Sequence, residues 1–544
     1  MKGRKFVRIP HPTSLYSVSC PLLLPYFSSA IYDRIVPNEN ICGGVPMKYR
    51  STRSNETVTA EEALVKGLAD DGGLYVPESL PAPFLQADEL KDMTYEELAA
   101  FVLSHFLTDI PEDELKKLTH NAYTGTFETE EIVPVKTLSQ SFSMAEMFHG
   151  RTCAFKDLAL SLFPYLLVYA KKQEKDGKEI LILTATSGDT GKAALEGFRD
   201  VPGVHIMVFY PSHGVSPLQQ DQMQKQLGDN VKVLGIEGNF DDAQGTLKQV
   251  FGSSLRREEA EKGVLFSSAN SINIGRLLPQ VVYYVWIWLQ LLKNGSIGPD
   301  ETFNVVVPTG NFGNILAAWL AKKAGVPIGQ LICASNENKV LADFFETGIY
   351  DINRPFYTTE APSMDILISS NFERFLYYLT GSAEEVKDSM EQLKKEGKYQ
   401  VSKEAFHKAG MEMTGGWAAP EEMIHAMGEV YENYDYLMDP HTAVAYSVYD
   451  HLKREGKIAR HSHTVIISTA HPYKFPGVVA KSLGLKEMDS PYDTLREISD
   501  KTSISIPSQL GELENRPKRF TETIDRKDMA DAIRDYAEEI IKKN

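Results

Sequence analysis

FHGRTCAFKDLAL, residues 148–160, places a lysine, Lys156, at the start of an apolar helical segment. In three further stretches a polar or glycine-rich turn lies at the end of an apolar run: TATSGDTGKAA (184–194), VVPTGNFGNILA (306–317) and STAHPYKFP (468–476). Apolar runs that end in this way and alternate with helical segments are typical of parallel strands covered by helices on both faces. The four stretches therefore predict an α/β fold whose ligand lies at the carboxyl ends of its strands.

The candidate strands divide between two open parallel-sheet lobes. The strands expected from the sequence are 179–186, 205–211, 232–238, 303–310, 330–336 and 463–470. We expect residues 161–265 to form the smaller α/β lobe. The larger lobe is expected to combine 136–160 with 266–505 and to carry a less regular insertion at 337–440. Residues 47–135 are expected to form a mainly helical N-terminal domain, and residues 506–544 a C-terminal helical segment.

Length and charge exclude several classes of protein. The chain has 544 residues and a mass of 60.8 kDa, which favours two to four domains over one core. Its formal net charge is −17, which argues against a general affinity for nucleic acid or anionic membranes. No apolar run approaches the ~20 residues of a membrane span. A phosphorylated small substrate remains compatible with this charge, because it needs only a local cluster of donors.

The cysteines and the N-terminal residues 1–46 carry information about the cellular compartment of the protein. Cys20, Cys42, Cys153 and Cys333 form no CxxC pair, and their spacing predicts neither a disulfide framework nor a metal site. A reducing cytoplasm fits this pattern best. Cys153 is close to Lys156 but is expected to be a small space-filling residue rather than a nucleophile. Residues 1–46 differ in composition from the rest, and we expect the functional chain to begin at Met47, with 1–46 a start-site artefact or a disordered extension.

Three of the stretches together suit pyridoxal 5′-phosphate. Lys156 offers an amine to the aldehyde, although alone it is equally well explained as a surface lysine at a helix start. GNFGN (310–314) joins an apolar strand to a helix, so its backbone amides are suited to a phosphate. Ser468 and Thr469 offer a hydroxyl to the ring nitrogen. The combination therefore predicts this cofactor, whereas the absence of a G-x-G-x-x-G pattern disfavours a dinucleotide.

The remaining stretches suit a substrate. TSGDTGK (186–192) fails as a nucleotide-binding P-loop, because Thr186 replaces the first glycine and Ala193 follows the lysine. Its hydroxyls and amides open a helix instead, where they suit a substrate carboxylate. SSANSINIGRLLPQ (267–280) offers neutral donors and one guanidinium, Arg276, suited to a phosphate. By itself this last stretch is better explained by a helix cap and a surface arginine.

Taken together, the stretches resemble the threonine synthases, a family of fold-type II pyridoxal-phosphate lyases. GLADDGGLYVP (67–77), PSMDILISSNFERF (362–375) and DPHTA (439–443) also resemble blocks of that family. The resemblance makes Lys156 the Schiff-base lysine and catalytic base. It implies a cofactor site of Asp189 near the ring oxygen, Thr469 or Ser468 at the ring nitrogen, and a phosphate cradle of Gly310, Asn311, Phe312, Gly313 and Asn314. It implies substrate contacts from Ser187 and Thr190 to the carboxylate and from Asn270, Arg276 and Arg374 to the phosphate.

The resemblance implies that O-phospho-L-homoserine and water become L-threonine and phosphate. A related phospholyase would release 2-oxobutanoate, ammonia and phosphate, and a metabolite-binding protein on the same fold would catalyse nothing. The sequence leaves both alternatives open, together with the role of Arg151, which departs from the FHGPT form of the stretch. We expect a monomer or homodimer with a small-molecule substrate and no metal, nucleic acid or membrane partner.

Overall fold

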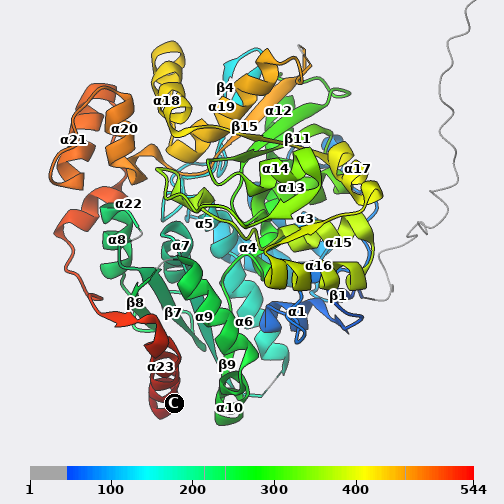
Figure 1. Cartoon of the computed structure of the whole chain (residues 1–544), viewed down its shortest axis with the longest axis vertical. Helices are drawn as coiled ribbons and strands as arrows, with labels where there is room; N and C mark the ends of the chain where they lie inside the picture. The colour runs from blue at the N-terminus through cyan, green and yellow to red at the C-terminus, as the bar shows by residue number, and fades with distance from the viewer. Residues whose placement is uncertain (1–45, 175, 214, 239, 460, 544) are drawn as a thin grey trace, which may run out of the picture. The chain divides into compact units, whose positions relative to one another are not determined.

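The computed structural model describes residues 46–174, 176–213, 215–238, 240–459 and 461–543 (Figure 1). The predicted extension at 1–46 therefore lies outside the described residues, apart from Pro46. The structure confirms the mixed α/β class, because two separate sheets with mainly parallel strands are each packed against helices.

A six-stranded sheet in the order β14-β11-β10-β15-β5-β4 forms the larger lobe. Its strands are β4 (Val135–Ser139), β5 (Phe142–Glu146), β10 (Phe303–Pro308), β11 (Ile328–Ser335), β14 (Met413–Trp417) and β15 (His463–Ser468). All neighbouring pairs are parallel except β4 and β5. Successive side chains of β10 enter different cores: Val305 and Val307 join α12 (Pro279–Lys293) and α13 (Gly313–Ala324), and Val306 joins α19 (Pro440–Arg454). Both faces of the sheet are therefore covered at β10, which explains why Val305, Val306 and Val307 are all apolar.

The smaller lobe has a five-stranded parallel sheet in the order β16-β8-β7-β6-β9. Its strands are β6 (Glu179–Ala185), β7 (Val204–Pro211), β8 (Val231–Glu237), β9 (Val264–Ser267) and β16 (Thr523–Asp525). The helices of this part of the chain are α6 (Phe163–Glu174), α7 (Asp189–Gly197), α8 (Pro217–Gln224), α9 (Phe240–Gly252) and α10 (Ser254–Lys262).

The C-terminal segment completes the smaller lobe. Residues 506–544 were expected to be helical, but β16 pairs with β8 as an edge strand before α23 (Met529–Lys543) begins. Met529 and Ile533 of α23 are buried in the same core as Leu181 of β6 and Phe209 of β7. In Figure 1 this red segment lies beside the green strands of the smaller lobe. The lobe is thus assembled from two distant parts of the sequence.

The N-terminal part holds a small antiparallel sheet and four helices. They are β1 (Tyr49–Ser51), β2 (Thr57–Val58), β3 (Tyr75–Pro77), α1 (Ala60–Lys66), α2 (Ala87–Leu90), α3 (Tyr95–Ser104) and α4 (Glu112–Tyr123). Thr59 and Glu62 cap α1 reciprocally, and Gly67 ends it with a φ of 70°. The Asn273 amide donates to the carbonyl of Leu64 at 2.9 Å. This contact fixes α1 against the loop that the sequence predicts to bind substrate phosphate.

The stretch expected as an insertion, 337–440, contains one strand of the main sheet. Its helices are α14 (Val340–Thr347), α15 (Phe372–Thr380), α16 (Ala383–Glu396), α17 (Lys403–Glu412) and α18 (Pro420–Tyr434), with the antiparallel strand pair β12 (Ile349–Asp351) and β13 (Lys398–Gln400). However, β14 lies within this stretch and pairs in parallel with β11. The insertion therefore ends earlier than the sequence indicated. The last helices before the C-terminal segment are α20 (Pro476–Ser482), α21 (Pro491–Thr502) and α22 (Ser508–Gly511).

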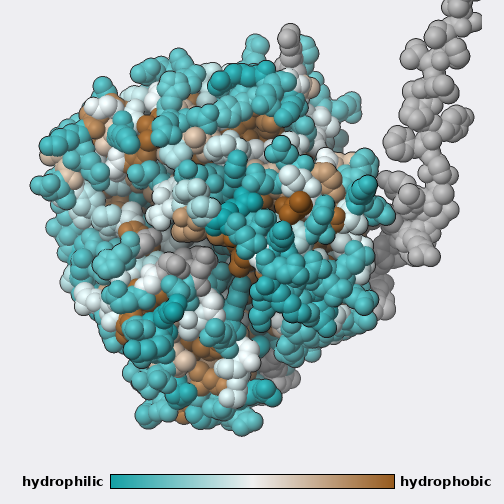
Figure 2. Space-filling view, viewed as in Figure 1, coloured by the Kyte–Doolittle hydropathy of each residue, from teal (hydrophilic) through white to brown (hydrophobic). Residues whose placement is uncertain are grey.

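The surface is mostly hydrophilic. On the face seen in Figure 2, hydrophobic residues form small separate groups among hydrophilic ones. Among the described residues, no helix combines the length and the apolar character that a bilayer crossing requires.

Candidate active site

A pocket lies where β6, β10 and β15 end, as expected for parallel sheets. Its walls come from α5 (Lys156–Leu160), α11 (Ile274–Leu277), η2 (Pro362–Met364) and the turns before α7 and α13. The predicted site residues that line it are Lys156, Ser187, Thr190, Asn270, Arg276, Gly310, Asn311, Phe312, Gly313, Asn314 and Thr469. Three predicted residues, Asp189, Arg374 and Ser468, are buried next to the pocket or behind its walls and do not line it.

Lys156 is the first residue of α5 and is held at the end of β15. The amide of Phe155 donates to the carbonyl of Thr469 at 2.8 Å, and Ala154 forms an isolated bridge with Ala470. The Lys156 side chain is 10% exposed, and its Nζ lies 3.4 Å from the Ser363 hydroxyl. Burial lowers the pKa of this amine to about 8, although the nearby Asp189 carboxylate opposes the change. A lysine in this state is readily available as a neutral amine.

The turn Gly310–Asn314 has the shape of an anion cradle. A Cβ at Gly310 would lie 2.3 Å from the carbonyl oxygen of Ser363, so only glycine fits there. Phe312 has a φ of 62° and forms the N-cap of α13, which begins at Gly313. The first amides of a helix have no acceptor within the helix, and here they belong to residues of the pocket wall. The turn therefore fits the phosphate of a bound cofactor.

Asn314 adds a side-chain donor to this cradle. Its Oδ1 accepts hydrogen bonds from the hydroxyls of Tyr283 and Tyr284 at 2.7 and 2.6 Å. Its Nδ2 is buried and has no hydrogen-bond partner within the described part of the chain. Two tyrosines thus fix the amide so that its nitrogen remains available to an acceptor, which is a second feature that fits an anionic group.

Arg276 is a buried cation without a carboxylate partner among the described residues. Its Nη1 donates to the carbonyl of Ala269 at 2.5 Å, whereas its Nε has no partner. Asn270 beside it also has an unpaired buried oxygen, Oδ1. Burial lowers the pKa of Arg276 to about 10, so the guanidinium is still charged at neutral pH. An unpaired buried charge is costly, and a bound anion would compensate it.

The turn 186–190 presents two hydroxyls to the pocket. Thr186 uses its own hydroxyl within the turn, where it accepts hydrogen bonds from the amides of Gly188 and Gly191 at 2.9 and 2.8 Å. Gly188 has a φ of 131°, a value that favours glycine, and α7 begins at the next residue. Ser187 and Thr190 line the pocket at this helix N-terminus. The geometry is suited to a carboxylate.

The structure distinguishes between the two predicted hydroxyls at the end of β15. Thr469 lines the pocket. The Ser468 hydroxyl is turned into the core, where it accepts hydrogen bonds from Tyr436 and Thr442, both at 3.3 Å. Of the two residues, only Thr469 is placed to contact a ligand.

Arg374 has a different place from the one the sequence predicted. Its guanidinium is 0% exposed and donates to the backbone carbonyls of Tyr75, Ser271 and Ile272 at 2.8, 3.2 and 2.6 Å. It also donates to Oδ1 of Asn371, whose amide nitrogen donates to the Ser271 hydroxyl at 2.9 Å. Arg374 therefore holds the loop at Ser271 and Ile272 through hydrogen bonds from outside the pocket, and its guanidinium does not point into the pocket.

Sequence reasoning missed three residues next to Lys156. Ser363 and His441 line the pocket, and Lys474 is fully buried behind it in η3 (Pro472–Lys474). The Ser363 amide donates to Nε2 of His441 at 3.1 Å. The proton of the neutral ring is therefore on Nδ1, which donates to Asp439 at 2.7 Å. All three lie in stretches that resemble the family. Their residue types gave no sign of their contacts, since these are tertiary.

Two residues near Lys156 take no part in the pocket. Cys153 is buried at a φ of 57°, and burial raises the pKa of its thiol well above the usual range. This agrees with a space-filling role and not with a nucleophile. Arg151 is exposed and lines a different cavity between α4 and α6.

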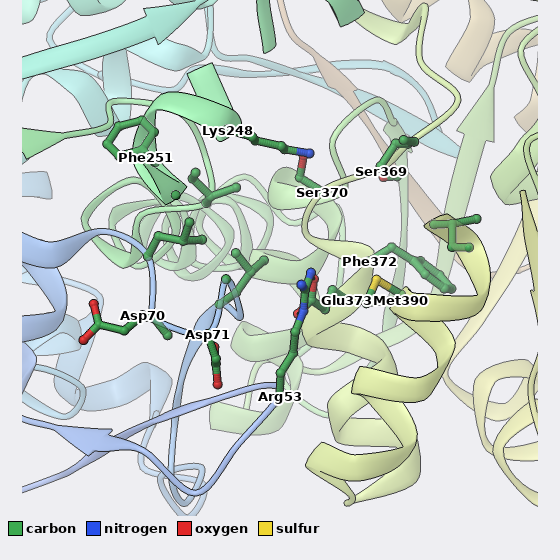
Figure 3. Close-up of a pocket in the computed structure, with 18 of the residues that line it drawn as sticks. Arg53, Asp70, Asp71, Lys248, Phe251, Ser369, Ser370, Phe372, Glu373 and Met390 are labelled. Carbon is green, nitrogen blue, oxygen red and sulfur yellow. Dashed lines mark hydrogen bonds and ion pairs between the residues drawn. The ribbon is translucent and has the colours of Figure 1, made fainter. Parts of the chain in front are cut away.

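A further cavity of about 400 Å³ lies between the N-terminal part, α9 and the region of α15, α16 and the β12–β13 pair (Figure 3). Arg53 crosses it to form a paired contact with Glu373, with Nε–Oε1 at 2.8 Å and Nη2–Oε2 at 2.7 Å. Ile272 also lines this cavity and is adjacent in sequence to Ser271 of the active-site pocket. None of the predicted site residues lines it. The ion pair therefore ties the N-terminal part to α15 next to Arg374.

Comparison with known proteins agrees with this geometry. A family model described as threonine synthase N terminus matches residues 48–123, and one described as threonine synthase, C-terminal, matches 442–536. The model between them, pyridoxal-phosphate dependent enzyme, matches 133–470. Threonine synthase of Saccharomyces cerevisiae is 36% identical over 489 residues, which cover 84% of this chain and 93% of that protein. The chain belongs to the threonine synthase family.

Other members of the family show the same likeness. Threonine synthase of Pseudomonas aeruginosa is 38% identical over 442 residues, covering 80% of this chain and 90% of that protein. Human threonine synthase-like 1 is also 38% identical over 442 residues, but these cover 79% of this chain and 58% of that longer relative. The chain thus spans little more than half the length of that protein.

Solved structures confirm the predicted fold-type II architecture. Yeast threonine synthase superposes with a TM-score of 0.80 at 33% identity, covering 91% of this chain and 99% of that one. The PLP-bound threonine synthase from Brucella melitensis gives a TM-score of 0.78 at 36% identity, covering 90% and 99%. Membership of this pyridoxal-phosphate-dependent family agrees with the cradle at Gly310–Asn314 and the buried amine of Lys156.

Proposed function

We propose that this chain is a threonine synthase that converts O-phospho-L-homoserine and water into L-threonine and phosphate, with pyridoxal 5′-phosphate as cofactor. The observation that supports this most is Arg276, a buried cation with no salt bridge to a carboxylate among the described residues, on which Asp157 acts only at longer range. It shares one pocket with Lys156, a buried amine of lowered pKa. Such a site suits a substrate that carries its own phosphate in addition to an amino-acid group.

The shape of the pocket supports the cofactor residues that we propose. When bound, the cofactor would withdraw electrons from the substrate and so acidify the protons near its α-carbon. Lys156 would provide the amine for the cofactor aldehyde. The amides of Gly310–Asn314 would hold the cofactor phosphate, and the Thr469 hydroxyl and the Asp189 carboxylate are the predicted partners of the ring nitrogen and the ring oxygen. The Asp189 carboxylate also contacts Ser363 and Lys474.

Two groups of residues hold the substrate. Ser187 and Thr190, at the start of α7, bind its carboxylate through hydroxyl and helix N-terminal amide donors. Arg276 and Asn270 bind its phosphate, for which a guanidinium offers paired charge-assisted hydrogen bonds. Binding the substrate at both ends fixes its Cα beside Lys156, which is a condition for efficient proton transfer.

The reaction needs one mobile base and one stabilised leaving group. Lys156, as the neutral amine, removes the proton from Cα, and a second proton leaves from Cβ. The bond between Cγ and the phosphate oxygen then breaks, and Arg276 stabilises the charge on the departing phosphate. Water adds its oxygen to Cβ, while protons return to Cγ and Cα. The products are L-threonine and phosphate, so one water is consumed per turnover.

The setting of the enzyme is also part of the proposal. Cys153 and Cys333 are both buried free thiols, which supports a reducing cytoplasm. The net charge of −17 and the hydrophilic face in Figure 2 support a small-molecule substrate rather than nucleic acid or a membrane. We expect the protein to act as a monomer or homodimer.

Lys156→Ala tests the assignment of the base. Cofactor-loaded wild type and variant are given O-phospho-L-homoserine, and released phosphate is measured. Wild type should release phosphate, and the variant should show none above the protein-free blank. Appreciable phosphate from the variant would remove Lys156 from the mechanism. Phosphate accompanied by 2-oxobutanoate and ammonia instead of threonine would make the protein a phospholyase, and substrate binding without any phosphate release would make it a metabolite-binding protein.

A further inference from the structure

A second buried lysine lies on the opposite side of Asp189 from Lys156. Lys474 is 0% exposed, and its Nζ lies 2.7 Å from Oδ1 of Asp189 and 2.8 Å from the carbonyl oxygen of Thr152. It does not line the active-site pocket, and Asp189 lies between it and Lys156. The proposed reaction gives this lysine no role. A fully buried ammonium is costly unless an opposite charge compensates it, and here that charge is Asp189.

The two oxygens of Asp189 face different partners. Oδ1 accepts from Lys474 and from the Gln219 amide, at 2.7 and 2.9 Å. Oδ2 accepts from the Ser363 hydroxyl at 3.2 Å and lies 3.8 Å from Nζ of Lys156. The close ionic contact of Asp189 is thus with Lys474, and its contact with Lys156 is long. Lys474 and Gln219 together turn the carboxylate away from the pocket lysine.

The charges around this carboxylate explain why the arrangement matters. Burial alone would raise the pKa of Asp189, but the positive charges of Lys474 and then Lys156 lower it, so the carboxylate stays ionised. An ionised Asp189 favours the protonated form of Lys156, whereas Lys474 and Arg276 favour the neutral amine. Without Lys474, the buried carboxylate would have Lys156 as its nearest cation.

We propose that Lys474 is a positioning residue that pairs with Asp189 and thereby leaves Lys156 free to act as a neutral amine. The inference deepens the proposed function and rests on it, because it assumes that the Lys156 amine reacts. Charged groups that act on Lys156 come from several elements besides its own. They are Asp157 on α5, Asp189 on α7, Arg276 on α11 and Lys474 on η3. Of these, Lys474 acts on Lys156 through a carboxylate that touches both lysines.

Cofactor capture by the cofactor-free, full-length chain tests the proposal. Pyridoxal 5′-phosphate is added at a series of pH values, and the rate at which its lysine-bound absorption appears is recorded. Wild type should capture faster as the pH rises, with a midpoint near the Lys156 pKa of about 8. In Lys474→Met we expect this midpoint to rise by roughly one to two pH units, because Asp189 then stabilises protonated Lys156. Lys474→Arg, which keeps the charge, should stay within about half a unit of wild type.

A double variant separates this role from a purely structural one. In Lys474→Met with Asp189→Asn the unpaired carboxylate is gone, so the midpoint should return toward that of wild type. If Lys474 only filled space, Lys474→Met would lower the thermal unfolding midpoint without moving the pH midpoint of cofactor capture. Adding Asp189→Asn would then restore neither midpoint. Lys192→Met is the matched control, because Lys192 is another buried lysine, on α7 of the smaller lobe, and pairs with Glu196 on its own helix. It should lower stability and leave the titration near that of wild type.

The possible failures are distinguishable. If borohydride reduction and peptide mapping of the wild type find the cofactor on a residue other than Lys156, the proposed function fails. If wild type captures the cofactor at Lys156 but Lys474→Met titrates at the same pH, only the role of Lys474 is overturned. The same conclusion follows if the double variant titrates like Lys474→Met. Should Lys474→Met not fold, Lys474→Gln replaces it in the same comparison.

Discussion

Arg374 and Arg276 are both fully buried arginines, and the structure gives them opposite roles that mutation separates. Arg374 donates to three backbone carbonyls and to Asn371, whereas Arg276 donates to the carbonyl of Ala269 and its Nε has no partner among the residues that the structure describes. We compare Arg374→Met with Arg276→Met, since methionine keeps much of the side-chain length without the charge. Loss of Arg374 should mainly reduce stability, and loss of Arg276 should mainly reduce catalysis.

The magnitudes follow from the partners that each substitution leaves behind. Arg374→Met leaves four acceptors without their donor, two of them buried and two partly buried, and a buried one costs about 1–3 kcal/mol unless the loops relax. With relaxation we expect a total of about 3–5 kcal/mol, as is usual when a buried polar network is broken. Arg276→Met leaves one carbonyl unpaired and removes an uncompensated charge, so its cost should be about 1 kcal/mol or less. Loss of the substrate-phosphate contacts should lower kcat/KM by about 10- to 150-fold, equivalent to about 1.5–3 kcal/mol.

Urea unfolding followed by tryptophan fluorescence, together with kcat/KM for phosphate release, measures both effects. Midpoints are compared instead of extrapolated free energies, because a chain of several lobes need not unfold in two states. We expect a clearly lower midpoint for Arg374→Met than for Arg276→Met. If Arg374→Met unfolds at the wild-type urea concentration yet loses as much kcat/KM as Arg276→Met, then Arg374 contacts the substrate. Its assignment as a residue that only holds the substrate loop would then be wrong.

Three further predictions concern the cradle, the C-terminal segment and the thiol. Gly310→Ala should weaken cofactor binding about 10- to 100-fold, because the new Cβ would lie 2.3 Å from a carbonyl oxygen. At Gly313 the nearest atom to a new Cβ is 3.3 Å away, so Gly313→Ala should weaken binding less. Cofactor titration by absorbance compares the two variants, and equal affinities would contradict the assignment of the cradle. Ile533→Ala should destabilise the smaller lobe by about 2–4 kcal/mol, because Ile533 of α23 is fully buried against it. An unchanged urea midpoint would show that α23 does not stabilise that lobe. Cys153→Ser should keep turnover within a few-fold of wild type, and loss of phosphate release without loss of folded protein would reveal a chemical role for the thiol.

The sequence predicted the strands that carry the site better than the strands at the sheet edges. Residues 303–308 (FNVVVP) and 463–468 (HTVIIS) each contain at least three consecutive apolar residues, so their assignment depends on a strong local signal. By contrast, β14 contains two adjacent glycines in MTGGW, and β16 has only three residues. Such short or glycine-containing strands form because a neighbouring strand offers hydrogen bonds, which local sequence does not record.

The same limit explains which site residues could be predicted. Lys156 and Gly310–Asn314 follow from motifs whose backbone geometry is local, and the structure places them in one pocket. Arg374 was expected in that pocket because the resemblance to the threonine synthases implied a contact with the substrate phosphate. Its guanidinium instead faces carbonyls that come from distant parts of the chain. Lys474 was overlooked for the related reason that only tertiary contacts bring it to Asp189.

The central claim is that a phosphate leaves from carbon and that water adds to the neighbouring carbon. Turnover of O-phospho-L-homoserine by the cofactor-loaded protein in ¹⁸O-labelled water tests this most directly, with both products analysed by mass spectrometry. Our account predicts equal amounts of phosphate and L-threonine, with the label in the threonine hydroxyl and none transferred to phosphate in the reaction. Label in phosphate together with homoserine would show simple ester hydrolysis, and phosphate with 2-oxobutanoate in place of threonine would show a phospholyase; either result would contradict the account.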